Sequence, residues 1–304
     1  MSAGSAPVQF DPVAPFGGDT VPMGIEVVGV PAAAGILTAY NARGITHSAE
    51  ARKPVVIIPG FTGSKEDFRT LVPLLAERRW PVVVYSQRGQ ADSAAPLGVH
   101  NYRLDDFVAD AVIVATRVGG GRPVHLVGHS FGGIVAQHAA LAEPALFRSV
   151  TLLCSGPYGW PGRHADTMRI VADRGSIGLW ERDHPGRLAL SDAELGAESA
   201  FLRARARATS RDNLLAGAQI LRDQVDVTDQ LRRTGIPLHV AHGEFDDKWP
   251  INDQHGMAER LGASYSVIAG GAHSPQLEAA DATTAALDGF WARLPRPHPS
   301  SNDH

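Results

Sequence analysis

A serine enclosed by glycines is the clearest chemical feature of the sequence. Residues 128–132 read Gly-His-Ser-Phe-Gly, the pattern G-x-S-x-G with Ser130 at its centre. An apolar run (124–127) precedes it and a helix-forming segment (131–141) follows, so a strand, a sharp turn and a helix are expected. The turn needs glycines because larger side chains beside the serine would clash. Ser130 is therefore the candidate nucleophile, held out at the edge of a sheet.

A serine hydroxyl reacts only when a neighbouring base takes its proton, and histidine is the side chain that titrates near neutral pH. The chain has 13 histidines, so residue type does not choose one. In sites built on this turn the order along the chain is Ser, then Asp or Glu, then His. Residues 270–275 read Gly-Gly-Ala-His-Ser-Pro and follow the last predicted strand, which makes His273 the candidate base. His129 neighbours the serine and is interpreted as packing the turn.

The acid that orients the histidine is expected in the loop after the predicted strand 237–242. That loop contains three carboxylates, Glu244, Asp246 and Asp247. We favour Asp246 and keep Asp247 as the main alternative.

Attack on an acyl group creates an oxyanion, which needs donors already aimed at it. One donor is expected to be the backbone N–H of Phe131, directly after the nucleophile. The other is expected in the loop 59–64, Pro-Gly-Phe-Thr-Gly-Ser, where Phe61 is the candidate.

Apolar strands alternate with amphipathic helices along most of the chain, which favours right-handed crossovers and a mostly parallel sheet. Between 156 and 232 no strand pattern occurs, and helices are predicted instead, for example over 191–208 and 210–222. We therefore expect a core formed by 23–155 and 233–294, a helical cap inserted at 156–232, and flexible ends at 1–22 and 295–304. The predicted strands are 24–30, 35–41, 55–59, 81–86, 123–128, 149–154, 237–242 and 264–269.

Together these pieces, spread over roughly residues 24–294, resemble the α/β-hydrolase superfamily. The resemblance implies an α/β fold with an eight-stranded, mostly parallel sheet and a helical cap inserted after the sixth strand. It also supports the triad of Ser130, Asp246 and His273, but it does not name a substrate. From the triad we predict a serine hydrolase that cleaves a carboxylic ester, or a related acyl bond, through an acyl-enzyme. Two positions depart from the family's usual D-x-R-G-x-G-x-S loop: Ser86 replaces its Asp and Ala91 its second Gly. In the oxyanion loop, Pro59 stands where the family often has His.

Several functions share this set of residues. A cofactor-free perhydrolase or a carbon–carbon bond hydrolase would use the same triad, and a thioesterase or lactonase would fit as well. A non-catalytic small-molecule receptor is the alternative from another class, and turnover of any ester would separate it from an enzyme.

The substrate pocket is expected between the cap and the sheet edge. Trp160, Trp180 and Trp249 are candidate walls that would bind an apolar group, with core packing as the alternative for each. Three cap arginines, Arg203, Arg205 and Arg207, could meet an anionic substrate, but a solvated helix face is the favoured interpretation.

The remaining features exclude other classes of partner. A net charge of −4 and a pI near 6.3 give no surface for nucleic acid or anionic membranes. No metal-ligand cluster or complete dinucleotide-binding motif occurs, so neither a metal nor a cofactor is expected. The single cysteine, Cys154, fits a small buried side chain. With no signal-peptide pattern and no run of about 20 apolar residues, a cytoplasmic protein is predicted.

Overall fold

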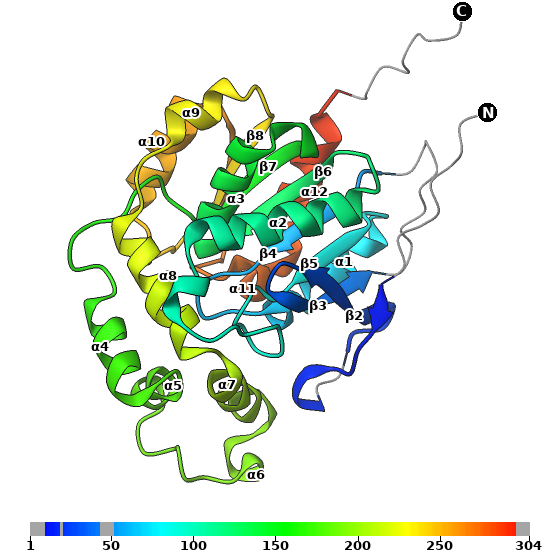
Figure 1. The fold of residues 1–304 in the computed structure, drawn as a ribbon. Coiled ribbons are helices and arrows are strands. Elements are labelled where there is room, and N and C mark those ends of the chain that lie inside the picture. The colour runs from blue at the N-terminus through cyan, green and yellow to red at the C-terminus, as the bar shows by residue number, and fades with distance from the viewer. Residues whose placement is uncertain (1–9, 19–20, 43–51, 296–304) are drawn as a thin grey trace, which may run out of the picture.

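The computed structural model describes residues 10–18, 21–42 and 52–295. Its centre is one sheet in the order β1-β2-β3-β5-β4-β6-β7-β8-β9, parallel from β5 to β9 and antiparallel on the β1–β3 side (Figure 1). The strands are β1 (Asp11–Pro12), β2 (Ile25–Ala32), β3 (Gly35–Ala42), β4 (Val55–Ile58), β5 (Val82–Tyr85), β6 (Val124–His129), β7 (Phe147–Leu153), β8 (Leu238–Gly243) and β9 (Ser264–Ile268).

Eight of these strands correspond to the predicted ones, and the α/β class with a mostly parallel sheet is confirmed. The count of eight was one too low, because β1 pairs Asp11 and Pro12 with Gly29 and Val28 at the antiparallel edge. A two-residue strand held only by backbone pairing leaves no hydrophobic alternation in the sequence. Strand β1 lies within residues 1–22, one of the two ends predicted to be flexible. The other such end, 295–304, lies outside the described residues apart from Pro295.

Helices cover both faces of the sheet, since the central strands carry apolar side chains on each side. In β4, Val56 and Ile58 face the core formed with α2 (Leu104–Gly119) and α3 (Phe131–Ala142). Val55 and Ile57 point the other way, to α1 (Leu71–Glu77) and α12 (Ala280–Arg293). α2 and α3 lie in front of the sheet in Figure 1, with α1 and α12 behind it.

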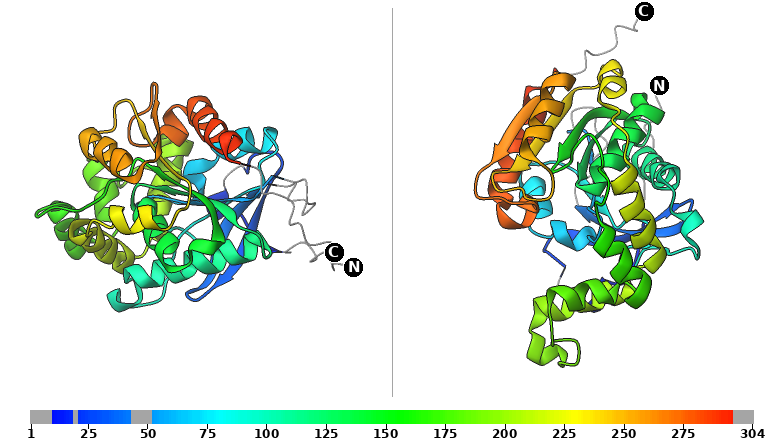
Figure 2. Two further views of the ribbon diagram at one scale, coloured as in Figure 1. Left: turned by 90° about the horizontal axis from the view of Figure 1, so that it is seen from above. Right: turned by 90° about the vertical axis from the view of Figure 1, so that its left-hand side faces the viewer.

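Between β7 and β8 the structure has six helices and no strand, over the residues for which a helical cap is predicted. Figures 1 and 2 show α4, α5, α6 and α7 standing out from the layered part, with α8 linking them to it. The predicted helix over 191–208 is two helices, because Gly196 between them has a φ of 77°. The bounds are α4 (Ala165–Arg174), α5 (Ile177–Asp183), α6 (Asp192–Leu195), α7 (Ala197–Ala208), α8 (Arg211–Asp223) and α9 (Thr228–Arg233).

Two further helices follow the last strands of the sheet. α10 (Ile251–Leu261) lies between β8 and β9, and α11 (Pro275–Glu278) begins just after His273. None of the helices in the described residues is both long and apolar enough to cross a membrane.

Candidate active site

Ser130 sits on a strained turn between β6 and α3. Its φ and ψ are 53° and −116°, a conformation that non-glycine residues rarely adopt. The neighbouring glycines make the turn possible. A Cβ on Gly128 would lie 2.3 Å from the carbonyl oxygen of Gly132, and one on Gly132 would lie 2.3 Å from that of Ile58. The backbone here is packed too closely for any side chain, as the sequence pattern predicts.

His273 connects the serine to a carboxylate. Its Nε2 lies 3.0 Å from Ser130 Oγ, and its Nδ1 lies 2.8 Å from Asp246 Oδ1. With a proton on Nδ1 donated to Asp246, Nε2 is left to accept the serine hydroxyl. This is the arrangement in which an imidazole acts as a general base.

Asp246, rather than Asp247, is the carboxylate that meets the histidine. Its oxygens also accept the backbone N–H of Lys248 at 3.0 Å and Gln254 Nε2 at 2.9 Å. Burial alone would raise the pKa of Asp246. The hydrogen bonds from His273, Lys248 and Gln254 outweigh burial, so the pKa lies below its usual value. Asp247 is exposed and pairs with Lys248 Nζ at 2.8 Å.

The amides of Phe61 and Phe131 are free to act as oxyanion donors. Phe131 is the first residue of α3, where a helix N–H has no intrahelical acceptor. In the described part of the chain neither amide donates to a protein acceptor. The loop 59–64, the candidate oxyanion loop, is close to Ser130, since a Cβ on Gly60 would lie 3.4 Å from Ser130 Cβ.

Two buried glutamines that the sequence reasoning missed hold the oxyanion loop. Gln87 Nε2 donates to the carbonyl of Pro59 at 2.9 Å, and Gln90 Nε2 donates to that of Gly60 at 2.7 Å. Gln90 Oε1 accepts the backbone N–H of Gln87 at 2.9 Å, which fixes the orientation of the Gln90 amide. The peptide anchored by Gln90 is the one that carries the Phe61 N–H.

The loop that departs from the family pattern supplies both glutamines. Ser86 Oγ, where the family has Asp, accepts the backbone N–H of Lys65 at 3.1 Å. Ala91, where the family has Gly, keeps the left-handed conformation with a φ of 46°. The presence of Ser86 and Ala91 in the sequence indicated that this loop differs from the usual loop of the family. The sequence did not indicate which groups the side chains of the loop contact.

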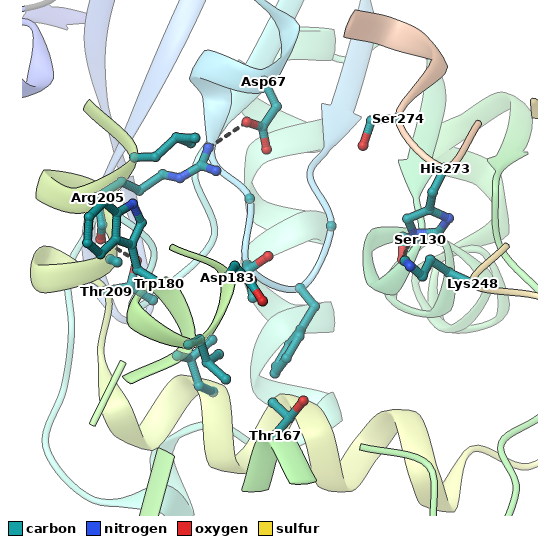
Figure 3. A pocket seen from close by; sticks show the side chains of 18 of the residues that line it. Asp67, Ser130, Thr167, Trp180, Asp183, Arg205, Thr209, Lys248, His273 and Ser274 are labelled. Carbon is teal, nitrogen blue, oxygen red and sulfur yellow. Dashed lines mark hydrogen bonds and ion pairs between the residues drawn. The ribbon is translucent and has the colours of Figure 1, made fainter. Parts of the chain in front are cut away.

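A cavity of about 750 Å³ lies beside Ser130 and His273 and extends under the cap helices (Figure 3). Trp160 and Trp180 are among the residues that line it. Trp249 does not, so its assignment as a wall is corrected: it is 1% exposed and fills the space that a Cβ on Gly156 would need. Its ring packs edge-on against Trp160 at 6.1 Å.

None of the three cap arginines presents an unpaired charge to the cavity. Arg203 is buried and pairs with Asp192, away from the cavity, and Arg207 is exposed. Arg205 lines the cavity but pairs with Asp67 (Figure 3).

The residues behind the triad do not fit a metal ion. Among the described residues, one group of three potential ligands lies within reach of a single ion: His129, Cys154 and His273. Both ring nitrogens of His273 are engaged with the serine and the aspartate. Burial, then the nearby His273, lowers the pKa of His129 to about 4, so its neutral ring donates from Nε2 to the carbonyl of His273 at 2.7 Å. Cys154 is buried, and burial raises the pKa of its thiol.

Comparison with known proteins defines the class. The family model described as the alpha/beta hydrolase fold matches residues 53–175. A pimeloyl-[acyl-carrier protein] methyl ester esterase of Methylococcus capsulatus is 31% identical over 205 residues, covering 64% of this chain and 80% of that protein. A non-heme haloperoxidase of Rhodococcus erythropolis is 28% identical over 260 residues, covering 78% and 92%.

A solved thermophilic esterase from Thermogutta terrifontis superposes with a TM-score of 0.70 at 21% identity, covering 88% of this chain and 98% of that one. This likeness concerns the fold alone. The chain belongs to the α/β-hydrolase fold family. The activities of its relatives support a hydrolase, which is the class predicted from the sequence.

Proposed function

We propose that this protein is a serine hydrolase that cleaves a carboxylic ester, with Ser130 as nucleophile, His273 as base and Asp246 as acid. The observation that carries the proposal is the continuous line of hydrogen bonds from Ser130 Oγ through His273 to Asp246, at 3.0 and 2.8 Å. The unpaired amides of Phe61 and Phe131 beside it would stabilise the oxyanion.

In the first step His273 Nε2 takes the hydroxyl proton as Ser130 Oγ attacks the ester carbonyl. The negative charge of the tetrahedral intermediate is held by the Phe61 and Phe131 N–H groups. Asp246 stabilises the imidazolium that forms. The intermediate collapses as the C–O bond to the alcohol breaks, and His273 returns the proton to the departing alkoxide, leaving the acyl group on Ser130.

In the second step water replaces the alcohol. His273 removes a proton from the water as its oxygen attacks the acyl-enzyme, and the same amides hold the second oxyanion. Collapse releases the carboxylic acid, and the proton returns to Ser130. Each step reuses one base, which is why a single histidine between a serine and a carboxylate suffices.

The test is labelling of the purified protein by a fluorophosphonate with peptide mapping, together with hydrolysis of short-chain p-nitrophenyl esters. Labelling at Ser130 with turnover is expected. Ser130→Ala should abolish labelling and lower the rate by about 10³-fold or more. Ser199→Ala, on the cap helix α7, is the matched control and should retain both. Ester turnover that survives Ser130→Ala would contradict the assignment.

A second candidate, a cofactor-free perhydrolase, is supported by the haloperoxidase relative, 92% of whose length is covered. Here hydrogen peroxide would attack the acyl-enzyme in place of water, giving a peracid and free Ser130. Bromination of monochlorodimedone with acetate, peroxide and bromide measures this activity. A perhydrolase would show strong bromination and weak ester hydrolysis. Loss of both activities in Ser130→Ala would assign them to one site.

A further inference from the structure

Arg163 is a buried cation in the wall of the cavity that Ser130 and His273 also line. It is 7% exposed, and its guanidinium contacts two indole rings that stand nearly perpendicular to each other, 4.1 Å from the centre of Trp160 and 3.7 Å from that of Trp249. Contact with aromatic rings stabilises the positive charge of a guanidinium but supplies no oxygen acceptor for its N–H groups.

The other cationic side chains of Arg and Lys type in the cavity wall each have a carboxylate partner in the same wall. These pairs are Arg205 with Asp67, Arg182 with Asp183, and Lys248 with Asp247. Across residues 10–18, 21–42 and 52–295, the guanidinium of Arg163 makes no hydrogen bond or ion pair, and its Nη1 is buried without a partner.

Asp246 is the carboxylate of the protein whose charge acts on Arg163, but the two side chains form no ion pair. The oxygens of Asp246 are occupied by His273, Lys248 and Gln254. Burial lowers the pKa of Arg163 to about 10, so it stays charged at neutral pH. A buried, charged and unpaired donor is unfavourable, and an arriving anion would remove that penalty.

We propose that Arg163 binds a carboxylate of the substrate, so that the preferred ester carries a single negative charge besides its scissile group. A planar guanidinium matches a carboxylate with two parallel hydrogen bonds. One unpaired cation suits a monoanion. A phosphate dianion would meet the carboxylates of Asp67, Asp183 and Asp247 around it with no second free cation. This inference rests on the proposed function, because it names the substrate class of the same site.

The kinetic test compares two p-nitrophenyl esters of equal chain length, the monoester of glutaric acid and the pentanoate. In wild-type protein kcat/KM should be higher for the anionic ester. Arg163→Met should lower the anionic-to-neutral ratio by about 10- to 100-fold, the effect of one lost charge-assisted pair. Arg163→Lys keeps the charge without the planar fork and should give an intermediate ratio.

Arg169→Met is the matched control. Arg169 is an exposed arginine on α4 that does not line the cavity. Its replacement by methionine changes the net charge by the same amount as Arg163→Met. Its ratio should equal that of wild type. An unchanged ratio in Arg163→Met, or an equal change in Arg169→Met, would overturn the inference while leaving the serine mechanism intact.

A binding measurement covers the case in which no ester is hydrolysed. Calorimetry with monomethyl glutarate is performed on Ser130→Ala protein, with and without Arg163→Met. Binding that the second substitution removes would support the anion site even if the proposed reaction were wrong. Equal binding, or no binding to either protein, would overturn the inference.

Discussion

Replacing Gln90 by leucine removes the hydrogen bond that anchors the peptide between Gly60 and Phe61. Gln90 Nε2 donates to the Gly60 carbonyl at 2.7 Å, and that carbonyl and the Phe61 N–H belong to one rigid plane. The bond therefore fixes the direction of the N–H and increases its polarity. We assign Gln90 the role of a positioning residue, one that acts on the oxyanion through another group.

The magnitude follows from the groups affected. Removing an oxyanion donor outright costs about 10²- to 10³-fold in kcat. Here the donor remains but its peptide is released, so we expect a loss of about 10-fold in kcat, or ~1.4 kcal/mol, with little change in KM. Stability should fall too, because the Gly60 carbonyl and the Gln87 N–H lose their partner at about 1–3 kcal/mol each.

Gln87→Leu is the control, since Gln87 holds the preceding carbonyl, that of Pro59, at 2.9 Å. Its stability should fall by less, because only one backbone group loses its partner, and the Phe61 peptide keeps its anchor. Urea unfolding and steady-state hydrolysis of one ester are measured for both variants. An equal kcat loss in the two would mean that the loop merely loosens. Unchanged kcat in Gln90→Leu would refute the reasoning.

The remaining predictions concern the acid, the turn and the response to pH. Asp246→Asn should lower kcat by about 10³- to 10⁴-fold, while Asp247→Asn stays within about 3-fold; the reverse order in the same ester assay would reassign the acid. Gly132→Ala places a methyl group 2.3 Å from a backbone oxygen and should cost about 3 kcal/mol or more, so an unchanged Tm would contradict the turn geometry. Burial lowers the pKa of His125 to about 3 and of His239 to about 4. The unfolded chain, with its histidine pKa near 6.5, therefore binds protons that the folded protein does not, and stability must fall as pH drops below about 6.5. At pH 5.5 each histidine should cost about 1.4 kcal/mol relative to pH 7.5, and His239→Gln should reduce this pH dependence in urea unfolding; an unaltered slope would show that His239 does not contribute.

Local patterns were sufficient where the chemistry depends on the chain's own neighbours. The turn at Ser130 needs glycines on both sides, which a pentapeptide displays directly. Strands such as Val55–Ile58 are buried on both faces and therefore read as unbroken apolar runs. The sequence could not decide which carboxylate contacts the histidine, because Asp246 and Asp247 are adjacent in the same loop. It therefore left both as alternatives.

By itself the sequence determined the family, the fold class and the order of the candidate nucleophile, acid and base. Tertiary structure decided which side chains are paired and which are buried. Trp160 and Trp249 are both tryptophans in loops, yet one lines the cavity and the other fills the space beside Gly156. Arg205 and Arg163 are both arginines of the cap segment, yet Asp67, 138 positions earlier in the chain, neutralises only the first. Burial and charge pairing depend on residues far apart in sequence, and for that reason only the folded chain assigns them.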